Sequence, residues 1–491
     1  MPPSTKSLSP RAVGARLDTR VGDLIDRAVA LNHRRRLSRH GWGFALAPHR
    51  DWSPRAPAWA AAVPVRPGNA VEVLIDGAAT CERISAAIAA ATSHVHIAGW
   101  HTSPGFRLTP TGPLLRDVLA DAADRVNVRL LMWGGAPIPI VEPTRSSVRR
   151  DREEFLRGSR LECELDTHGH LMHCHHEKIV VADDDVAIIG GLDLTALEGN
   201  RNDAQGHPHA DRLGWHDVAV QIRGPAVADI AQHFANRWRE VTARALPDPV
   251  PPQSAGTVAL QVLRTVPEKS YNFLPRGEFT VLEAYLQALR GAERLVYLEN
   301  QFLWSPEVAD VLADKLDNPP QPDFRVLLVL PRRPSNGKDT TRGQLAQLID
   351  ADSGRGRLLA TTLLGPTAAS PGVYVHAKVG IIDDHWLTIG SANLNTHSLF
   401  NDSEMNVLTL DPALARSTRI RLWSEHLHLP ENAVDGPPAE VIDTIWRAQC
   451  DLQDAVSARG DDPVHRVRRI EGLSRRMDRL EGPVRGLLVD G

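Results

Sequence analysis

The octapeptide His176-Glu177-Lys178-Ile179-Val180-Val181-Ala182-Asp183 returns two hundred positions later as His376-Ala377-Lys378-Val379-Gly380-Ile381-Ile382-Asp383. Both read H-x-K-x4-D. Each continues through six residues into a pair of small residues, Gly190-Gly191 or Gly390-Ser391. One such octapeptide could arise by chance, but two copies with the same downstream spacing indicate an internal duplication.

Features outside the octapeptides repeat in the same order. Asp217 and Glu404 each begin a strand-like segment, and a proline follows eight residues later in both. Strand-like and helix-like segments alternate over residues 70–133 and again over 258–330. This alternation predicts a parallel or mixed sheet that is covered by helices on both faces.

The period of the repeat is too long for a solenoid and predicts two fused domains of one fold. We expect an α/β protein of two similar halves, each a mixed sheet flanked by helices, with pseudo-twofold symmetry and one active site at their interface. Prolines, which cannot continue a helix or a central strand, mark the linker between the halves. The expected divisions are an Arg-rich extension at 1–68, a first half at 69–245, a Pro-rich linker at 246–256, a second half at 257–430 and a helical tail at 431–491.

The bulk composition is that of a soluble globular protein, with 491 residues, 24% of them charged, and a formal net charge of −4. We expect no stable nucleic-acid partner. The four cysteines lack C-x-x-C spacing, which favours a reduced, disulfide-free intracellular protein. The sequence shows neither an apolar signal region at its start nor a window long enough for a membrane span. We therefore expect a cytoplasmic location.

The first sixty residues are basic, with eleven Lys or Arg against four Asp or Glu. Apolar residues recur at helical spacing from Arg16 to Leu31, with arginines between them. The favoured interpretation is a solvated helix packed on the main body. The alternative is an interfacial helix that makes peripheral contact with an anionic membrane surface, on the inner side of the membrane.

In each octapeptide the His and Lys lie at positions i and i+2, which on a strand places both side chains on one face. The alternate aliphatic residues then point to the other face and suit a core. The Asp, at 183 or 383, ends the strand in a turn, and a second strand follows. Each octapeptide therefore predicts a hairpin with one imidazole and one ammonium group. A turn aspartate that hydrogen-bonds its own backbone accounts for Asp183 and Asp383 without an acid–base role.

Two such hairpins brought together would place His176, Lys178, His376 and Lys378 around one point. This set suits a phosphodiester, because the ammonium groups offset the charge that builds on the non-bridging oxygens. One imidazole can attack phosphorus while the other protonates the leaving oxygen. The attacking imidazole must be neutral and oriented, which a carboxylate on its other ring nitrogen provides. This scheme requires no metal and no cofactor.

Asp217 and Glu404 are the candidates for the orienting carboxylate, one in each half, and exposed surface charge is the alternative. Asn393 and Ser391 are the candidates for binding phosphate in the second half. The first half has Asp193 where the second has Asn393. An aspartate anion would repel phosphate, so the phosphate-binding role is not extended to Asp193.

The paired motifs resemble the phospholipase D superfamily over residues 70–430. The resemblance implies a two-step transfer through a phosphohistidine, with water or an alcohol as second acceptor. It implies that His176 is the nucleophile and His376 the general acid, and it includes Asp183 and Asp383 in the catalytic motif. The further motifs that carry it are Gly99-Trp100 with Ser103-Pro104, Gly190-Gly191-Leu192-Asp193, Trp215-His216-Asp217, Glu299-Asn300-Gln301-Phe302, Gly390-Ser391-Ala392-Asn393 and Trp423-Ser424-Glu425-His426.

Several of these motifs look more like the branch that acts on glycerophospholipids than like the nuclease branch. The implied function is hydrolysis or transphosphatidylation of a phospholipid substrate. The alternatives are a cardiolipin-synthase-type phosphatidyltransferase, a metal-independent nuclease of the same superfamily and a non-catalytic lipid-binding scaffold. Two intact motifs argue against the scaffold, which has no physical need for both imidazoles.

A run of histidines over 168–176 has the composition of a metal site. Alternate residues of a strand point to opposite faces, so the run cannot direct all its side chains at one ion. We therefore expect no metal at this run.

Overall fold

The computed structural model describes residues 31, 35, 36, 38, 39, 59–61, 63–136, 142–169, 173–195, 197, 201–208, 212–332 and 338–470. The predicted N-terminal helix, apart from its last residue, and the end of the predicted C-terminal tail lie outside these residues.

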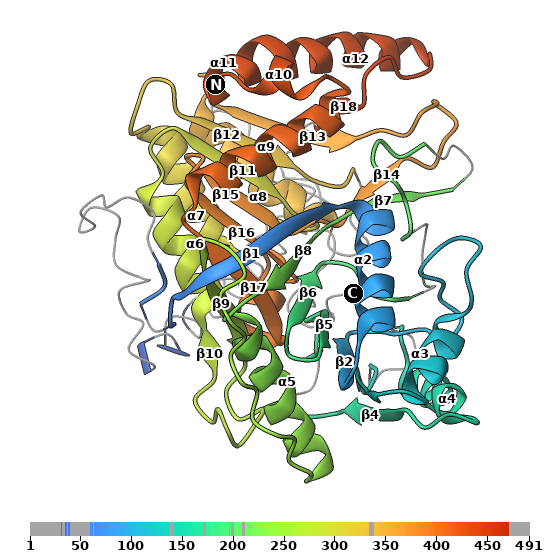
Figure 1. Cartoon of the computed structure of the whole chain (residues 1–491). Coiled ribbons are helices and arrows are strands. Elements are labelled where there is room, and N and C mark those ends of the chain that lie inside the picture. Colours follow the sequence, from blue (N-terminus) through green and yellow to red (C-terminus); the bar gives the residue numbers. More distant parts are fainter. Residues whose placement is uncertain are drawn as a thin grey trace, which may run out of the picture.

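Within the described residues, sixteen strands form one mixed sheet, in the order β18-β13-β12-β11-β15-β16-β17-β9-β1-β8-β6-β5-β2-β3-β4, with β10 paired to β9. Figure 1 shows this sheet at the centre of the molecule. A separate two-stranded sheet pairs β14 with β7. The strands are β1 Arg66–Ile75, β2 His94–Gly99, β3 Asn127–Trp133, β4 Glu162–Asp166, β5 Ile179–Ala182, β6 Val186–Gly190, β7 Gly214–His216, β8 Val218–Arg223, β9 Val258–Val266, β10 Glu278–Phe279, β11 Leu295–Glu299, β12 Arg325–Val329, β13 Leu358–Leu363, β14 Val373–Val375, β15 Val379–Ile382, β16 Trp386–Gly390, β17 Glu404–Thr409 and β18 Val467–Arg469.

The strand order repeats on the two sides of the β1–β9 pair. One side continues β8-β6-β5-β2-β3-β4, and the other continues β17-β16-β15-β11-β12-β13. On each side three consecutive strands are parallel to one another, β2-β3-β4 and β11-β12-β13, and they pair antiparallel with β5 and β15. The prediction of an α/β protein with a mixed sheet is confirmed. Antiparallel pairing of β1 with β9 joins the strands of both sides into a single sheet.

Helices cover both faces of this sheet (Figure 1). Alternation along β5 shows why: Ile179 and Val181 enter the core shared with α5 and α9, whereas Val180 and Ala182 enter the core under α2 to α4. The corresponding core on the other side lies under α6 to α8. The helices are α2 Asp76–Ala90, α3 Leu115–Ala123, α4 Arg145–Leu156, α5 Val227–Thr242, α6 Thr280–Gly291, α7 Pro306–Asp317, α8 Lys338–Asp352, α9 Pro412–Leu427, α10 Glu431–Val434, α11 Pro438–Val441 and α12 Arg447–Arg459, with π-helical turns at His397–Asn401 and Ile442–Trp446.

The predicted helical tail is wrong at one point, because it contains a strand. After α12 the chain returns as β18 and pairs antiparallel with β13, at the edge of the sheet. β18 covers the backbone groups that β13 would otherwise present at the sheet edge. In the described parts of the chain, none of the helices combines the length and apolar character that a membrane span needs.

Candidate active site

Each H-x-K-x4-D motif forms a hairpin that closes in a tight turn. Asp183 and Asp184 join β5 to β6 with φ of 55° at both residues, and Asp383 and Asp384 join β15 to β16 with φ of 53° and 51°. Positive φ at both central residues is the geometry of a type I′ turn, and Asp tolerates the left-handed region better than most residues. The hairpins are therefore encoded locally, as predicted.

The carboxylates of Asp183 and Asp383 bond a neighbouring strand rather than their own turns. Asp183 accepts the backbone N–H groups of residues 92–94 at 2.7–2.9 Å, and Asp383 accepts those of 293–295 at 2.7–2.8 Å. Burial opposes ionisation of Asp183, but these bonds lower its pKa below the ordinary value. The predicted bonding to their own backbone is therefore wrong, because each carboxylate satisfies free N–H groups where β2 or β11 begins.

The four-residue strands β5 and β15, each roughly 13 Å long, lie between these aspartates and the motif histidines. Asp183 and Asp383 therefore anchor strands, and we place them outside the group that could meet a phosphodiester.

The motif histidines lie in short segments just before β5 and β15, and not on the strands as predicted. Their backbone pairs with the opposite side of the molecule. The N–H of His176 donates to the carbonyl of Ser403 at 2.9 Å, and the N–H of His376 donates to the carbonyl of His216 at 2.8 Å. The hydrogen bond made by His376 continues the parallel pairing of β14 with β7. At the histidines, these hydrogen bonds replace the pairing within each hairpin that the sequence predicted.

The crossed backbone pairing places each histidine against the carboxylate of the other motif's side. His176 Nδ1 lies 2.9 Å and 3.1 Å from the two carboxylate oxygens of Glu404. His376 Nδ1 lies 2.7 Å from Asp217 Oδ2. All four side chains are buried. With a carboxylate on Nδ1, each imidazole is held in the tautomer that leaves Nε2 as the reactive nitrogen.

The Ser391 hydroxyl is bonded to Glu404, so phosphate would not be its only partner. Its hydroxyl donates to the Glu404 carboxylate and accepts the Met405 N–H at 3.0 Å. On the other side, a Cβ at Gly191 would collide with the Asp217 carboxylate. The Asp217 carboxylate occupies the space at Gly191 that corresponds to the Ser391 side chain beside Glu404. The Gly191/Ser391 difference between the motifs therefore accompanies the Asp217/Glu404 difference.

We expect Gly191→Ser to reduce turnover of a phosphodiester substrate by at least about 10²-fold, since it displaces the carboxylate that orients His376. Ser391→Gly removes one hydrogen bond to Glu404 and should reduce turnover by only about tenfold. Initial rates of the two variants, with their melting temperatures as the folding control, check this. Equal losses of turnover in the two variants would show that the position of Asp217 does not depend on a glycine at 191.

The two motif lysines have different surroundings. Lys178 Nζ lies 3.0 Å from Asp193 Oδ2, and both side chains are buried. Lys378 Nζ instead donates to the neutral amide of Gln301 at 3.3 Å, and Asn393 Nδ2 donates to the same oxygen at 3.3 Å. Lys178 is therefore paired with a carboxylate, whereas the partners of Lys378 Nζ are the Gln301 amide oxygen and the carbonyl of His376.

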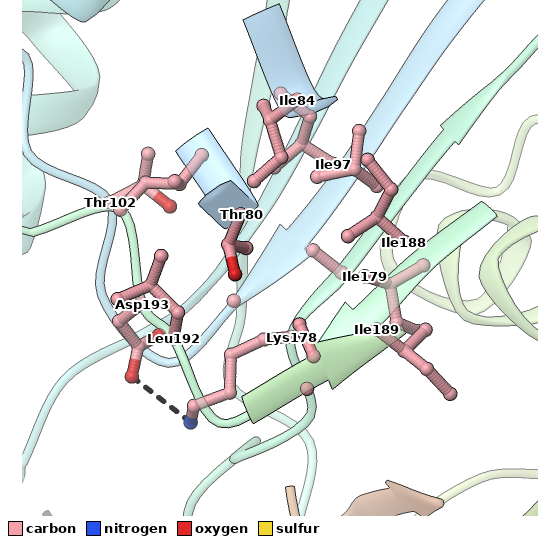
Figure 2. A pocket seen from close by; sticks show the side chains of 16 residues that line it. Thr80, Ile84, Ile97, Thr102, Lys178, Ile179, Ile188, Ile189, Leu192 and Asp193 are labelled. Atoms are coloured by element: carbon pink, nitrogen blue, oxygen red, sulfur yellow. Dashed lines mark ion pairs between the residues drawn. The ribbon is translucent and has the colours of Figure 1, made fainter. Parts of the chain in front are cut away.

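Figure 2 shows Lys178 extended toward Asp193, with Thr80, Thr102 and aliphatic side chains of the sheet behind it. The cavity behind the ammonium group has a volume of about 20 Å³, enough for about one water molecule. This space is too small to hold a substrate.

A larger cavity of about 710 Å³ lies beside β14. Tyr374, two residues before His376, forms part of its wall and accepts a hydrogen bond from Gln301 at 3.0 Å. Arg332 and Arg468 also line it. Its volume is in the range of small-molecule sites, and Val373 and Tyr374 of β14, shortly before the second motif, line it.

The imidazole of His376 is buried among several positive charges. Burial and the nearby charges of Lys378, Arg201 and Lys178 hold its pKa well below the ordinary value. An anionic group bound among these cations would offset their charge and raise the pKa of His376 again.

Arg201, Trp215 and Gln301 also line the site. The Arg201 guanidinium lies 3.6 Å from the centre of the Trp215 ring, and Trp215 lies 4.6 Å from the His376 ring. Arg201 was not predicted to belong to the site, because it stands in no recognisable motif. The motifs that contain Trp215 and Gln301 did indicate a place near the site.

The histidine run over 168–176 does not converge on one point within its described residues. His175 Nε2 lies 3.1 Å from Asp166, His176 lies on Glu404, and His173 Nδ1 contacts the carbonyl of Asn401. Other buried residues come together more closely, and two groups that share His216 could each hold an ion: Asp76, His207, His216 and Glu425, and His216, Glu299 and His426.

Comparison with known proteins identifies relatives of both motifs. A family model described as "Cardiolipin synthase, PLD-like domain" matches residues 285–423. Phospholipase D1 of Schizosaccharomyces pombe is 25% identical over 76% of this chain and 36% of that protein. Phospholipase D2 of Bos taurus is 23% identical over 90% of this chain and 60% of that protein. The chain thus spans about a third of the yeast relative and less than two thirds of the bovine one.

Solved structures with a similar fold are also found. Phosphatidylserine synthase from Haemophilus influenzae Rd KW20 superposes with a TM-score of 0.53 at 13% identity, covering 79% of this chain and 96% of that one.

Proposed function

Because this chain belongs to the phospholipase D superfamily, we propose that it catalyses phosphodiester hydrolysis or phosphatidyl transfer on glycerophospholipids through a phosphohistidine. The observation that carries the proposal is the crossed pair of histidine–carboxylate contacts, His176 with Glu404 and His376 with Asp217. Two imidazoles with Nδ1 occupied, each accompanied by a lysine, supply a nucleophile and an acid for one phosphorus atom.

In the first step, His176 Nε2 attacks phosphorus and the bond from phosphorus to the leaving alcohol oxygen breaks. Glu404 stabilises the positive charge that develops on the ring through its contact with Nδ1. His376 gives its Nε2 proton to the leaving oxygen. Lys378 and Asn393 offset the negative charge on the non-bridging oxygens.

In the second step, water or an alcohol attacks the phosphohistidine, and His376 takes the proton of the attacking oxygen. The bond from phosphorus to His176 then breaks. Because the depressed pKa of His376 comes from burial and neighbouring cations, the bound phosphodiester anion favours the protonated form that the first step needs. Release of the product favours the neutral form again.

We propose that the site lies between two pseudo-symmetric halves. The repeated strand order on either side of β1–β9 supports this, as do the contacts that each motif makes with the other side. A complete site would then need both halves of one chain.

The lipid substrate class is supported by the names of the relatives and by the cavity beside Tyr374. We propose that the polar part of a phospholipid, or of an acceptor alcohol, occupies this cavity, with its phosphate between Lys378 and the two histidines. The bound molecule would then present its scissile bond to His376 from the β14 side.

Purified protein with liposomes of mixed common phospholipids tests the function, with lipid products followed by mass spectrometry. We expect phosphatidic acid in water and a new phosphatidyl alcohol when a short primary alcohol is added, from one common intermediate. Plasmid DNA without added metal is the parallel substrate. Cleavage of DNA with no lipid product would assign the nuclease function, and liposome binding without any product would assign the scaffold.

A further inference from the structure

A buried cluster of two histidines and two carboxylates lies one residue from the proposed active site. Its members are Asp76 at the start of α2, His207, His216 at the end of β7 and Glu425 in α9. All four are buried, and one donor atom from each lies within 4.8 Å of the others. They come from four separate segments, so the sequence alone does not connect them.

The spacing of the donor atoms matches a four-coordinate ion. His207 Nε2 lies 3.6 Å from Asp76 Oδ2 and 3.2 Å from Glu425 Oε1. His216 Nδ1 lies 2.9 Å from Asp76 Oδ1 and 3.8 Å from the same Glu425 oxygen. Tetrahedral Zn²⁺ with nitrogen and oxygen ligands separates its donors by about 3.4 Å. The four distances, which involve both carboxylate oxygens of Asp76, lie on either side of that value.

The opposite nitrogen of each histidine is already held by a further carboxylate. His207 Nδ1 lies 3.2 Å from Asp203 Oδ2, and His216 Nε2 lies 2.7 Å from Glu299 Oε2. This is the arrangement that metal-bound histidines have, because the outer carboxylate fixes the tautomer and raises the basicity of the nitrogen that faces the ion. Both histidines therefore have the correct nitrogen directed at the cluster.

Three atoms of the cluster are buried without a hydrogen bond of normal geometry, and these are Asp76 Oδ2, His207 Nε2 and Glu425 Oε2. The atoms of Asp76 and His207 face one another across the cluster at 3.6 Å. Buried polar atoms are almost always hydrogen-bonded, so an unsatisfied pair on a common centre calls for a ligand between them. Both residues also have positive φ, 67° and 48°, in a backbone region that is retained where the surroundings impose it.

We propose that Asp76, His207, His216 and Glu425 bind one divalent transition-metal ion, with Zn²⁺ the best match to two imidazoles and two carboxylates. The ion's two positive charges balance the two carboxylates that hold it. The site is structural, because all four positions are filled by the protein and none is left for a substrate.

The ion would hold the active site together. His216 accepts the backbone N–H groups of His376 and Ala377 at 2.8 Å and 3.1 Å, and it precedes Asp217. Glu425 belongs to α9, far along the chain from the other three ligands. A metal here would therefore tie β7, and with it Asp217, to both halves of the fold.

Elemental analysis of the full chain, expressed without an affinity tag in zinc-supplemented medium, tests the proposal. We expect about one zinc per chain in the wild type and below about 0.2 in His207→Gln. A Co²⁺-substituted sample should show the visible absorption of a four-coordinate ion. Removing zinc with a chelator should lower the melting temperature of the wild type by about 5 °C or more, and adding zinc should restore it.

Two variants serve as controls. His101→Gln removes another buried histidine with a carboxylate partner, Asp151 at 3.0 Å, and should retain a full equivalent of zinc. His176→Ala should also retain it, which separates this site from the proposed chemistry.

Zinc below a tenth of an equivalent in the wild type, with a melting temperature insensitive to chelator and to added zinc, would mean that protons alone fill the cluster and would overturn the proposal. Full zinc occupancy in both His207→Gln and Glu425→Gln would overturn it as well. Should His207→Gln fail to fold, the wild-type metal content and chelator response decide the question.

Discussion

Replacing His176 or His376 with Ala is expected to reduce release of the lipid headgroup by at least about 10⁴-fold. The reason differs between them. Without His176 there is no nucleophile, whereas without His376 the leaving alcohol departs unprotonated. The measurement is the initial rate of headgroup release from liposomes, with His465→Ala, a partly exposed histidine on the C-terminal segment, as the matched control.

A substrate with an activated leaving group separates the two roles. An aryl oxide leaves without a proton, so an aryl phosphodiester should restore the first step in His376→Ala but not in His176→Ala. The rescued variant also lacks the base for the second step. It should therefore accumulate a phosphohistidine, which appears as added mass on the intact protein and maps to residue 176.

Rescue of His176→Ala in place of His376→Ala would reverse the assignment of nucleophile and acid. Headgroup release at the wild-type rate by either variant would disprove the mechanism altogether.

Glu404→Gln and Asp217→Asn are each expected to reduce turnover by about 10²–10⁴-fold with little change in KM. A neutral amide fills the same volume, but it neither stabilises an imidazolium nor enforces the tautomer with Nε2 free. The contacts are His176 with Glu404 at 2.9 Å and His376 with Asp217 at 2.7 Å. The loss should therefore lie in the chemical step.

With the aryl phosphodiester, Glu404→Gln and Asp217→Asn also test whether each carboxylate acts on the histidine of the other motif. Asp217 serves the acid, so the first step of Asp217→Asn should recover with the activated leaving group. Glu404 serves the nucleophile, so Glu404→Gln should not recover, although Glu404 lies on the same side of the chain as His376. Recovery of Glu404→Gln alone would show that each carboxylate acts within its own half. Glu283→Gln, a buried carboxylate bonded to the Ala61 N–H, is the control for loss of a buried charge.

Local features of the site were predictable because short-range rules determine them. The hairpins follow from strand-forming residues bounded by Asp183-Asp184 and Asp383-Asp384, whose left-handed conformations make the turns. The aliphatic alternation of β5 and β15 follows from the period of a strand. The duplication is visible in the spacing and predicted two His–Lys pairs, and the alternation of strand-like and helix-like segments predicted the mixed sheet.

The partners of these residues were not predictable from spacing. Asp183 bonds residues 92–94, about ninety positions away, and Ser391 serves Glu404 and not phosphate alone. Arg201 reaches Trp215 from a segment without a motif. β18 pairs with β13 after a turn of the chain that the helical pattern of the tail did not suggest. Asp183 and β18 have partners about ninety or more positions away, whereas Ser391 and Arg201 contact residues that are closer along the chain but that no strand or helix period brings to them.

The amino-acid order therefore specifies two hairpins, two His–Lys pairs and two carboxylates at equivalent positions, because local propensity and periodicity act over a few residues. It does not specify which carboxylate serves which histidine. That choice comes from packing, since β14 pairs with β7 and the segment before β5 bonds to the carbonyl of Ser403. The crossing of these segments pairs His176 with Glu404 and His376 with Asp217, and it makes one site out of two motifs.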